Sequence, residues 1–85
     1  MKKDIIIYTN PSCPYCIRAI ELLRQKGQEM FLIDVIANPE KRKEMVERSG
    51  GCNTTPQIFI EDQHIGGCDD LYDLDAKGEL DKILK

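Results

Sequence analysis

The sequence predicts an α/β protein with a four-stranded mixed β-sheet flanked by helices, and three observations lead to this prediction. Two short apolar runs, 4–8 and 30–35, are separated by an amphipathic helical pattern. Such a strand–helix–strand unit forms a parallel strand pair with a right-handed crossover. Residues 57–66 have the pattern of a β-hairpin. A chain of 85 residues, 41% hydrophobic and 32% charged, fits one small globular domain spanning 1–85.

The first half of the chain is expected to supply the strand–helix–strand unit. The run 4–8 is short, continuous and β-branched, as in a buried strand. After a turn at 9–12, Pro14 suits the first turn of a helix, where its missing N–H costs nothing. Gly27 ends this helix, and a second apolar strand follows at 30–35. The apolar face expected for the helix consists of Ile17, Ala19, Ile20, Leu22 and Leu23.

The second half is expected to form a helix, the hairpin and a final acidic helix. Asn38 caps the first of these helices and Pro39 occupies its first turn, and the helix runs to about Arg48 with a basic exposed face. The hairpin over 57–66 turns at 61–63. The apolar residues expected on the two helices and at the end of the chain are Met45, Val46, Leu71, Tyr72, Leu74, Leu80, Ile83 and Leu84.

The formal net charge of −3 hides an asymmetry. Residues 1–50 carry nine Lys or Arg and seven Asp or Glu, whereas residues 51–85 carry three and eight. The acidic end argues against nucleic acid as a partner. The charges form either a solvated surface or the basic and acidic walls of a site. No apolar run approaches the roughly 20 residues of a membrane helix, and Met1-Lys2-Lys3 is not followed by the apolar region of a signal sequence. We therefore expect a cytoplasmic protein without membrane contacts.

The segment 11–16, Pro-Ser-Cys-Pro-Tyr-Cys, places two cysteines where the first strand gives way to the first helix. A free cysteine has a pKa of about 8.5, and the unpaired amides and dipole at a helix N-terminus lower it. Cys13, at the mouth of the helix, is therefore the candidate nucleophile, and Cys16, one turn inside, is the candidate resolving thiol. Because structural disulfides are rare in the cytosol, the four cysteines are expected to be catalytic or metal-binding.

Three motifs in this order resemble those of the glutaredoxins, which have the thioredoxin-like fold. Cys13-Pro14-Tyr15-Cys16 resembles their dithiol active site, and Thr54-Thr55-Pro56 resembles their Thr-Val-Pro loop. Gly66-Gly67-Cys68-Asp69-Asp70 is similar to their glutathione-binding turn. The similarity extends from 7–9 to 84–85 and places the chain close to the small bacterial members. It implies a glutathione-dependent oxidoreductase that reduces protein disulfides and glutathione mixed disulfides.

The resemblance also implies roles for individual residues. Cys13 attacks the disulfide and Cys16 completes the dithiol route. Pro56 is similar to a cis-proline that faces the active site and lets the Thr55 backbone pair with glutathione; the alternative is an ordinary trans-proline. The turn at 67–69 offers amides to the γ-glutamyl carboxylate, and its aspartates bind the ammonium group, cap the helix, or do both. The glutathione-binding residues implied in this way are Tyr15, Thr55, Pro56, Cys68, Asp69 and Asp70.

The chain departs from the family pattern at Asn10, where the glutaredoxins usually have a lysine that pairs with the glycyl carboxylate of glutathione. Lys41 or Arg42 could replace that lysine. We therefore expect weaker or more salt-sensitive binding of glutathione. Arg18 could support the Cys13 thiolate, or it could be a solvent-facing helix residue.

The remaining candidates have open interpretations. Tyr15 either lines the glutathione groove or packs on its loop. Cys68 is expected to be a small buried residue whose backbone matters. Cys52 lies outside the family motifs and is either an oxidisable thiol or an inert loop cysteine. His64 is spaced like neither a metal ligand nor a catalytic base, so we expect a polar surface residue.

Two other functions stay open at this stage. Cys13 and glutathione from each of two protomers could ligate an iron–sulfur cluster, whereas the cysteine spacing does not form a zinc site. A redoxin fed by thioredoxin reductase is the other alternative, although the chain has no Trp. We expect a monomer with no metal and no tightly bound cofactor, and with glutathione as co-substrate. Its protein partners are expected to be disulfide-containing or glutathionylated proteins, with ribonucleotide reductase and reductases of sulfur or arsenate metabolism as open candidates.

Overall fold

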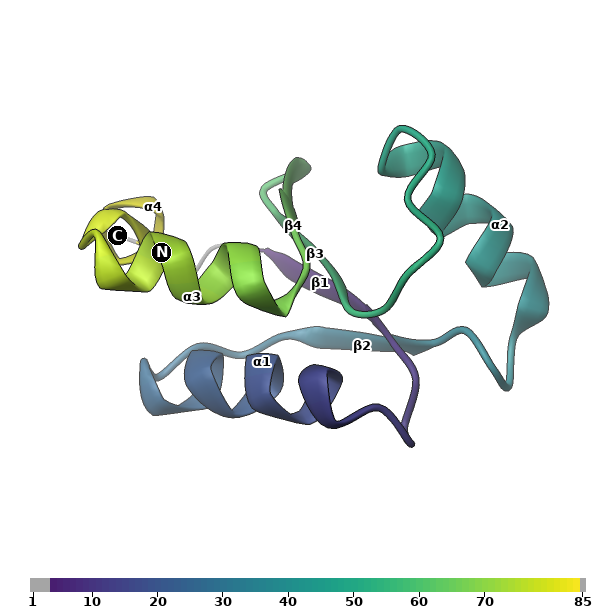
Figure 1. Cartoon of the computed structure of the whole chain (residues 1–85), viewed down its shortest axis with the longest axis horizontal. Coiled ribbons are helices and arrows are strands. Elements are labelled where there is room, and N and C mark those ends of the chain that lie inside the picture. The colour runs from purple at the N-terminus through teal and green to yellow at the C-terminus, as the bar shows by residue number, and fades with distance from the viewer. Residues whose placement is uncertain (1–3, 85) are drawn as a thin grey trace.

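The computed structural model describes residues 4–84 and confirms the predicted fold class (Figure 1). The expectations concerning residues 1–3 and Lys85 lie outside this range. Within 4–84, no helix has the length and apolar character needed to cross a membrane. The elements are, in chain order, β1 (Ile5–Thr9), α1 (Pro14–Gln25), β2 (Phe31–Asp34), α2 (Pro39–Arg48), β3 (Gln57–Ile60), β4 (Gln63–Gly66), α3 (Cys68–Ala76) and α4 (Glu79–Leu84).

The four strands lie in the order β2–β1–β3–β4. β1 pairs with β2 in parallel and with β3 in antiparallel orientation, and β4 is antiparallel to β3. Because β3 runs against β1, the start of β3 lies beside the end of β1, with Tyr8 opposite Gln57. The loop that leaves β1 and the loop that enters β3 therefore meet at one edge of the sheet. This edge carries the two cysteines of the first motif and the proline of the second.

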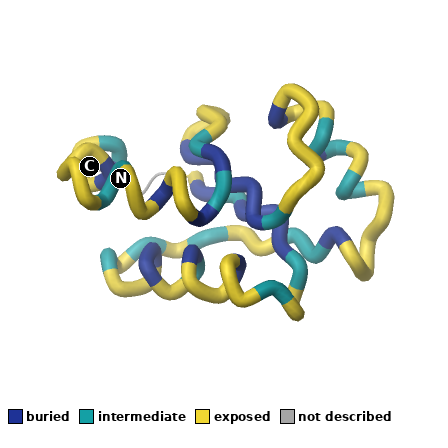
Figure 2. The backbone as a smooth tube through the Cα atoms, viewed as in Figure 1, coloured by how far each residue is buried: buried dark blue, intermediate teal, exposed yellow. Residues whose placement is uncertain are grey.

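Helices cover both faces of the sheet. α1, α3 and α4 pack on one face, and α2 packs on the other (Figure 1). Buried residues are concentrated in the central strands and on the sides of the helices that face them (Figure 2). Alternate residues of each strand point to opposite faces, so β1 and β3 contribute to both cores. The first core contains Ile5, Ile7, Ile58 and Ile60 of these strands, and the second contains Tyr8 and Phe59 together with Val35 and Met45.

The prediction for Ile17 in the strand–helix–strand unit was wrong, and the second strand is more exposed than its apolar sequence suggests. Ile17, expected on the apolar face of α1, is 49% exposed because the side of the helix that faces the sheet is formed by other residues. The apolar strand expected at 30–35 is β2, but its residues Phe31 and Leu32 are 66% and 45% exposed because β2 lies at the edge of the sheet. The fully buried residues of α1 are Cys16, Ala19, Leu22 and Leu23.

Three further differences concern the ends of elements. Gln63, expected in the turn, belongs to β4, because Glu61 and Asp62 make the turn with φ values of 51° and 65°. The single final helix is in fact two helices, α3 and α4, which separate at Gly78 with φ of 74°. Asn38 occupies the N-cap position of α2, but its side-chain amide donates a hydrogen bond to an upstream backbone carbonyl and caps nothing.

Candidate active site

The loop between β1 and α1 presents Cys13 at the N-cap position of the helix. Asn10 organises this loop with its side chain and its backbone. Its Oδ1 accepts a hydrogen bond from the Ser12 amide at 2.9 Å, and its carbonyl accepts one from the Cys13 amide at 2.9 Å. Pro14 follows at the first helical position, where no N–H is required. The Cys13 sulfur thus lies where the unpaired amides of the first helical turn are available.

The pKa of the Cys13 thiol lies below its ordinary value. Partial burial of the side chain raises this pKa. Hydrogen bonds from the backbone and thiol of Cys16, from the Tyr15 amide and from the Thr55 side chain lower it and together outweigh burial. Donors at a helix N-terminus stabilise the anion over the neutral thiol. Cys13 is therefore more ionised at neutral pH than a free cysteine.

Cys16 lies one turn further along α1 and is 1% exposed. Its sulfur accepts a hydrogen bond from the Asn10 amide at 3.5 Å. All four cysteines are free thiols, so the structure represents the reduced, dithiol form of the protein. Because Cys13 is half-buried and Cys16 is shielded from solvent, an incoming disulfide meets Cys13 first.

The segment that enters β3 lies across from Cys13. The Thr55–Pro56 peptide bond is cis, which is the isomer that the family resemblance implies. The Cys13 thiol donates a hydrogen bond to the Thr55 carbonyl oxygen at 3.8 Å. The antiparallel pairing of β1 with β3 accounts for this contact, because it places the two loops at the same edge of the sheet.

A cavity of about 340 Å³ extends from the N-terminus of α1 to the N-terminus of α3. Its volume is within the range of small-molecule sites, about 300–1,000 Å³. Cys13 does not line the cavity itself, but its thiol contacts Thr55, which does. The structure brings all six predicted glutathione-binding residues to its wall: Tyr15, Thr55, Pro56, Cys68, Asp69 and Asp70. The wall also contains Cys52, Thr54, Gln57, His64, Gly66 and Gly67.

The N-terminus of α3 forms the acidic end of this cavity. Gly67 is the N-cap, and its amide donates a hydrogen bond to Oδ2 of Asp70 at 3.0 Å. This is the capping role, and it uses one of the two carboxylate oxygens. The Asp69 side chain is exposed and has no hydrogen-bond partner among residues 4–84. Cys68 is buried, and burial raises the pKa of its thiol, so its sulfur stays protonated while its backbone lines the cavity.

Lys41 and Arg42, the two candidates to replace the missing lysine, differ in their contacts. Lys41 pairs with Glu44 at 3.5 Å within α2. Arg42 instead donates hydrogen bonds to Oδ1 and to the carbonyl oxygen of Asn53, at 3.0 and 3.1 Å. Asn53 lies in the chain between Cys52 and Thr54, two residues of the cavity wall, so Arg42 is bonded to the segment that carries this wall. The Asn10 side chain is engaged in its own turn.

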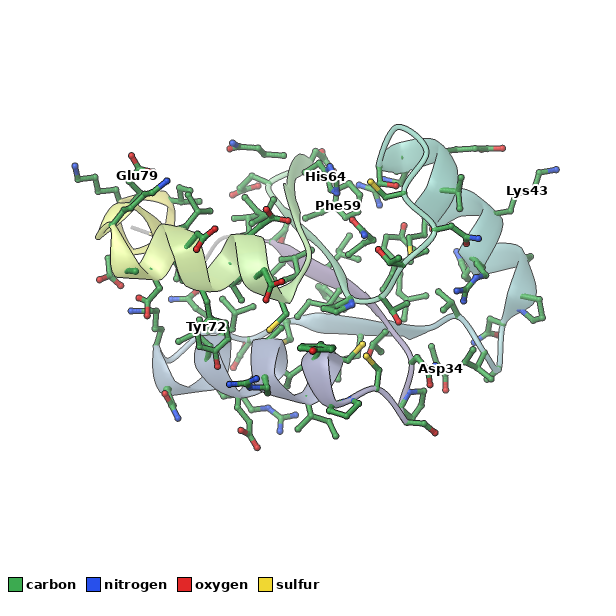
Figure 3. All side chains as sticks on the ribbon, viewed as in Figure 1. Asp34, Lys43, Phe59, His64, Tyr72 and Glu79 are labelled. Carbon is green, nitrogen blue, oxygen red and sulfur yellow. The ribbon has the colours of Figure 1, made fainter. Side chains whose placement is uncertain are left out.

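Arg18 has its contacts on the outer surface. Its guanidinium carbon lies 5.9 Å from the centre of the Tyr72 ring, and the Tyr72 hydroxyl donates a hydrogen bond to the Arg18 carbonyl at 3.2 Å. Figure 3 shows Tyr72 between α3 and α1. Arg18 therefore serves as a surface residue that joins these helices, in agreement with the second of its two interpretations.

Sequence reasoning missed two residues of the cavity wall, Gln57 and His64. His64 is exposed, as expected, yet its Nε2 lies 2.6 Å from Oε1 of Gln57, which is 3% exposed. A polar residue at the first position of a buried strand, directly after the Thr-Thr-Pro motif, was the signal that could have identified Gln57. Cys52 is exposed on the same wall. Within the described part of the chain, no three His, Cys, Asp or Glu side chains are grouped to hold a metal ion.

Comparison with known proteins agrees with this geometry. The family model for glutaredoxin matches residues 5–65. The matched region contains both cysteines of the dithiol motif and the Thr54–Pro56 segment, and it ends just before the turn at 66–70.

Individual glutaredoxins are similar over almost the whole chain. Glutaredoxin 3 of Escherichia coli K12 is 55% identical over 82 residues, which cover 96% of this chain and 98% of that protein. The solution structure of glutaredoxin from Brucella melitensis is 60% identical, with a TM-score of 0.85 over 99% of this chain and 90% of that one. The crystal structure of a buckwheat glutaredoxin–glutathione complex is 26% identical, with a TM-score of 0.88 over 96% of this chain and 76% of that one.

The fold and the dithiol site define a thiol–disulfide oxidoreductase with the thioredoxin-like architecture. The chain belongs to the glutaredoxin family. It is a dithiol glutaredoxin, an enzyme that couples glutathione to thiol–disulfide exchange through the C-x-x-C pair Cys13 and Cys16. The family resemblance predicted from the three sequence motifs is thereby confirmed.

Proposed function

We propose that this glutaredoxin reduces glutathione mixed disulfides and protein disulfides, with Cys13 as the attacking thiolate, Cys16 as the resolving thiol and glutathione bound in the cavity. One observation carries the proposal: the Cys13 sulfur, with its lowered pKa, lies 3.8 Å from the Thr55 carbonyl at the border of a cavity of about 340 Å³. The buckwheat relative, whose crystal structure is a complex with glutathione, supports glutathione as the occupant.

The reaction with a glutathione mixed disulfide requires only Cys13. Its thiolate attacks the glutathione sulfur, the mixed disulfide breaks, and the substrate leaves as a thiolate that takes up a proton. A second glutathione thiolate then attacks the glutathione sulfur of the Cys13 adduct and forms oxidised glutathione. Cys13 is released as the thiolate, and its lowered pKa makes it a good leaving group in this step.

The reaction with a protein disulfide requires both cysteines. Cys13 attacks one sulfur of the disulfide and forms a mixed disulfide with the substrate. The Cys16 thiolate then attacks the Cys13 sulfur, which releases the reduced substrate and leaves a Cys13–Cys16 disulfide. Two glutathiones restore the dithiol and become oxidised glutathione. Glutaredoxin potentials of about −200 to −230 mV lie close to the potential of the cytosolic glutathione pool, which supports a cytoplasmic site of action.

The binding roles follow the chemistry of glutathione. The Thr55 backbone pairs with the cysteinyl residue in the manner of an added strand, with Pro56 and Tyr15 beside it. The amides of Cys68 and Asp69 at the N-terminus of α3 receive the γ-glutamyl carboxylate. The Asp69 side chain, which has no hydrogen-bond partner among residues 4–84, receives the ammonium group together with the second oxygen of Asp70.

For the glycyl carboxylate we propose Arg42. Its guanidinium is held beside the cavity wall by two hydrogen bonds to Asn53, whereas Lys41 is paired with Glu44. An arginine has five N–H donors, so donors remain after these two bonds. Glutathionylated proteins and proteins with an accessible disulfide, ribonucleotide reductase included, are the proposed macromolecular substrates.

The test is the glutathione-dependent turnover of a small glutathione mixed disulfide, with NADPH and glutathione reductase regenerating glutathione. Wild type, Cys13→Ser and Cys16→Ser are compared. The expected result is no turnover with Cys13→Ser and substantial turnover with Cys16→Ser. Turnover that survives in Cys13→Ser contradicts the assignment of the nucleophile. Absence of turnover in the wild type removes the support for the glutathione site, and visible absorbance after anaerobic reconstitution with iron and sulfide then tests the cluster-carrier alternative.

A further inference from the structure

The segment 50–56 lacks regular secondary structure, yet side chains hold it in place on both sides. Ser49 bonds to both the amide and the carbonyl of Cys52 at 3.1 Å through its hydroxyl. Gln57, at the start of β3, holds the part of the segment nearest the cysteines. Its Nε2 donates to the carbonyl and to the hydroxyl of Thr54, at 3.0 and 3.2 Å. Thr54 immediately precedes the residue whose carbonyl contacts Cys13.

The orientation of the Gln57 amide determines which ring nitrogen of His64 acts as the donor in this contact. Because the amide nitrogen faces two oxygens of Thr54, the atom that faces His64 at 2.6 Å is the oxygen Oε1. An amide oxygen only accepts hydrogen bonds. Nε2 of His64 therefore carries a proton and donates to Gln57.

The His64 ring is itself held in place. It lies against Phe59, with ring centroids 5.0 Å apart and planes inclined by 32°. Phe59 is 2% exposed and belongs to the core beneath α2. Figure 3 shows His64 and Phe59 together on the β3–β4 hairpin. A continuous path of contacts thus runs from the core through His64 and Gln57 to Thr54.

We propose that His64 is a positioning residue for the glutathione reaction: through Gln57 it holds the Thr54–Pro56 segment at the distance from which Thr55 meets both Cys13 and glutathione. This inference rests on the proposed function and deepens it. Without His64, the buried Oε1 of Gln57 has no hydrogen-bond donor, and a Gln57 amide that rotates to find one breaks its two bonds to Thr54. His64 never touches the reacting sulfur, and its effect reaches Cys13 only through the segment that Gln57 holds.

The inference predicts a selective kinetic change in His64→Ala. We expect the KM for glutathione to rise about three- to tenfold, the equivalent of one lost hydrogen bond, with little change in kcat. We also expect the pH profile for alkylation of Cys13 to move to higher pH, because a hydrogen bond from the Thr55 side chain helps to lower the pKa of that thiol and depends on the position of the same segment. His64→Gln should restore both values, because its Nε2 reaches the same position as a donor. Gln63→Ala, on the same strand with an exposed side chain, serves as the matched control.

The decisive experiment measures kcat, KM and the Cys13 alkylation profile in wild type, His64→Ala, His64→Gln and Gln63→Ala. A purely structural role for His64 would lower the thermal stability of His64→Ala without changing KM or the alkylation profile, and that result overturns the inference. A His64→Gln protein that behaves like His64→Ala overturns it as well. If the wild type shows no turnover with glutathione, the proposed function fails, and the alkylation profile, which needs no glutathione, still decides the role of His64.

Discussion

The Cys13 sulfur and the Thr55 carbonyl oxygen lie 3.8 Å apart although 42 positions separate the two residues in the chain. The contact exists because β1 and β3 run antiparallel, so the loop after one strand meets the loop before the other. It joins the nucleophile of the proposed reaction to the backbone that would align glutathione. The site therefore depends as much on the segment 50–56 as on the C-x-x-C motif.

The first prediction concerns the ionisation of Cys13. Because its pKa is lowered, alkylation by iodoacetamide should reach its maximum rate at a lower pH than for a free cysteine, whose pKa is about 8.5. The rate is measured by mass spectrometry in a Cys52→Ser background, which removes the exposed thiol. The fast reaction should disappear in Cys13→Ser. A half-maximal rate at or above pH 8.5 would contradict the lowered pKa.

The second prediction concerns Gly66, which has φ of +117°. A β-carbon added at this position would collide with the carboxylate of Asp70. We expect Gly66→Ala to lower the free energy of unfolding by about 1–3 kcal/mol because of the backbone conformation. We also expect it to displace Asp70 from the Gly67 amide and to raise the KM for glutathione about tenfold.

Gly78→Ala separates these two effects. Gly78 also has a positive φ, of 74°, but a β-carbon there would meet nothing within 4 Å. We expect Gly78→Ala to lower the free energy of unfolding, measured in urea, by about 1–2 kcal/mol and to leave the KM for glutathione unchanged. Equal KM values for the two variants would show that the collision with Asp70 has no consequence for glutathione.

The order of strands and helices and the position of the dithiol motif could be predicted from the sequence because both follow local rules. β-Branched runs, a proline at the first helical position and glycines after helices all act within a few residues. The exposure of Ile17 could not be predicted in this way. Which residues a helix buries depends on how the helix is rotated against the sheet, and here the rotation buries Cys16 and leaves Ile17 exposed.

The side-chain contact between His64 and Gln57 could not be predicted from the sequence, for a different reason. His64 lies opposite Phe59 in the register set by the turn, and a register shift between Ile58 and Phe59 then places Gly66, not Ile65, opposite Ile58, next to Gln57. The turn at Glu61 and Asp62 has positive φ at both positions, without the glycine that usually signals such a turn. Neither the shift nor the turn type has a local signature here, so the side chains that meet across the hairpin could not be identified.

The third prediction tests the proposed contact with the glycyl carboxylate. Arg42→Gln should raise the KM for glutathione about three- to tenfold at low ionic strength and weaken its dependence on salt. Lys43→Gln removes the same charge from the next residue, whose side chain points away from the body of the protein (Figure 3). We expect wild-type KM and salt dependence for this control. Equal changes in the two variants would mean that net charge alone acts, and an unchanged KM in Arg42→Gln would contradict the contact.

The fourth prediction concerns a substitution that lowers the stability of the protein and leaves its activity unchanged. The buried Tyr8 hydroxyl donates to Glu44 at 2.6 Å and accepts from Arg48 at 2.9 Å beneath α2, and none of these three residues lines the cavity. Tyr8→Phe removes both hydrogen bonds. We expect it to lower the free energy of unfolding, measured in urea, by about 1–3 kcal/mol, while kcat and KM stay at wild-type values. Burial raises the pKa of Tyr8, so the wild type should also lose stability as the pH rises above about 10, where the unfolded tyrosine ionises first. That alkaline loss should be smaller in Tyr8→Phe. An altered KM would contradict the separation, because it would tie this cluster to the glutathione site.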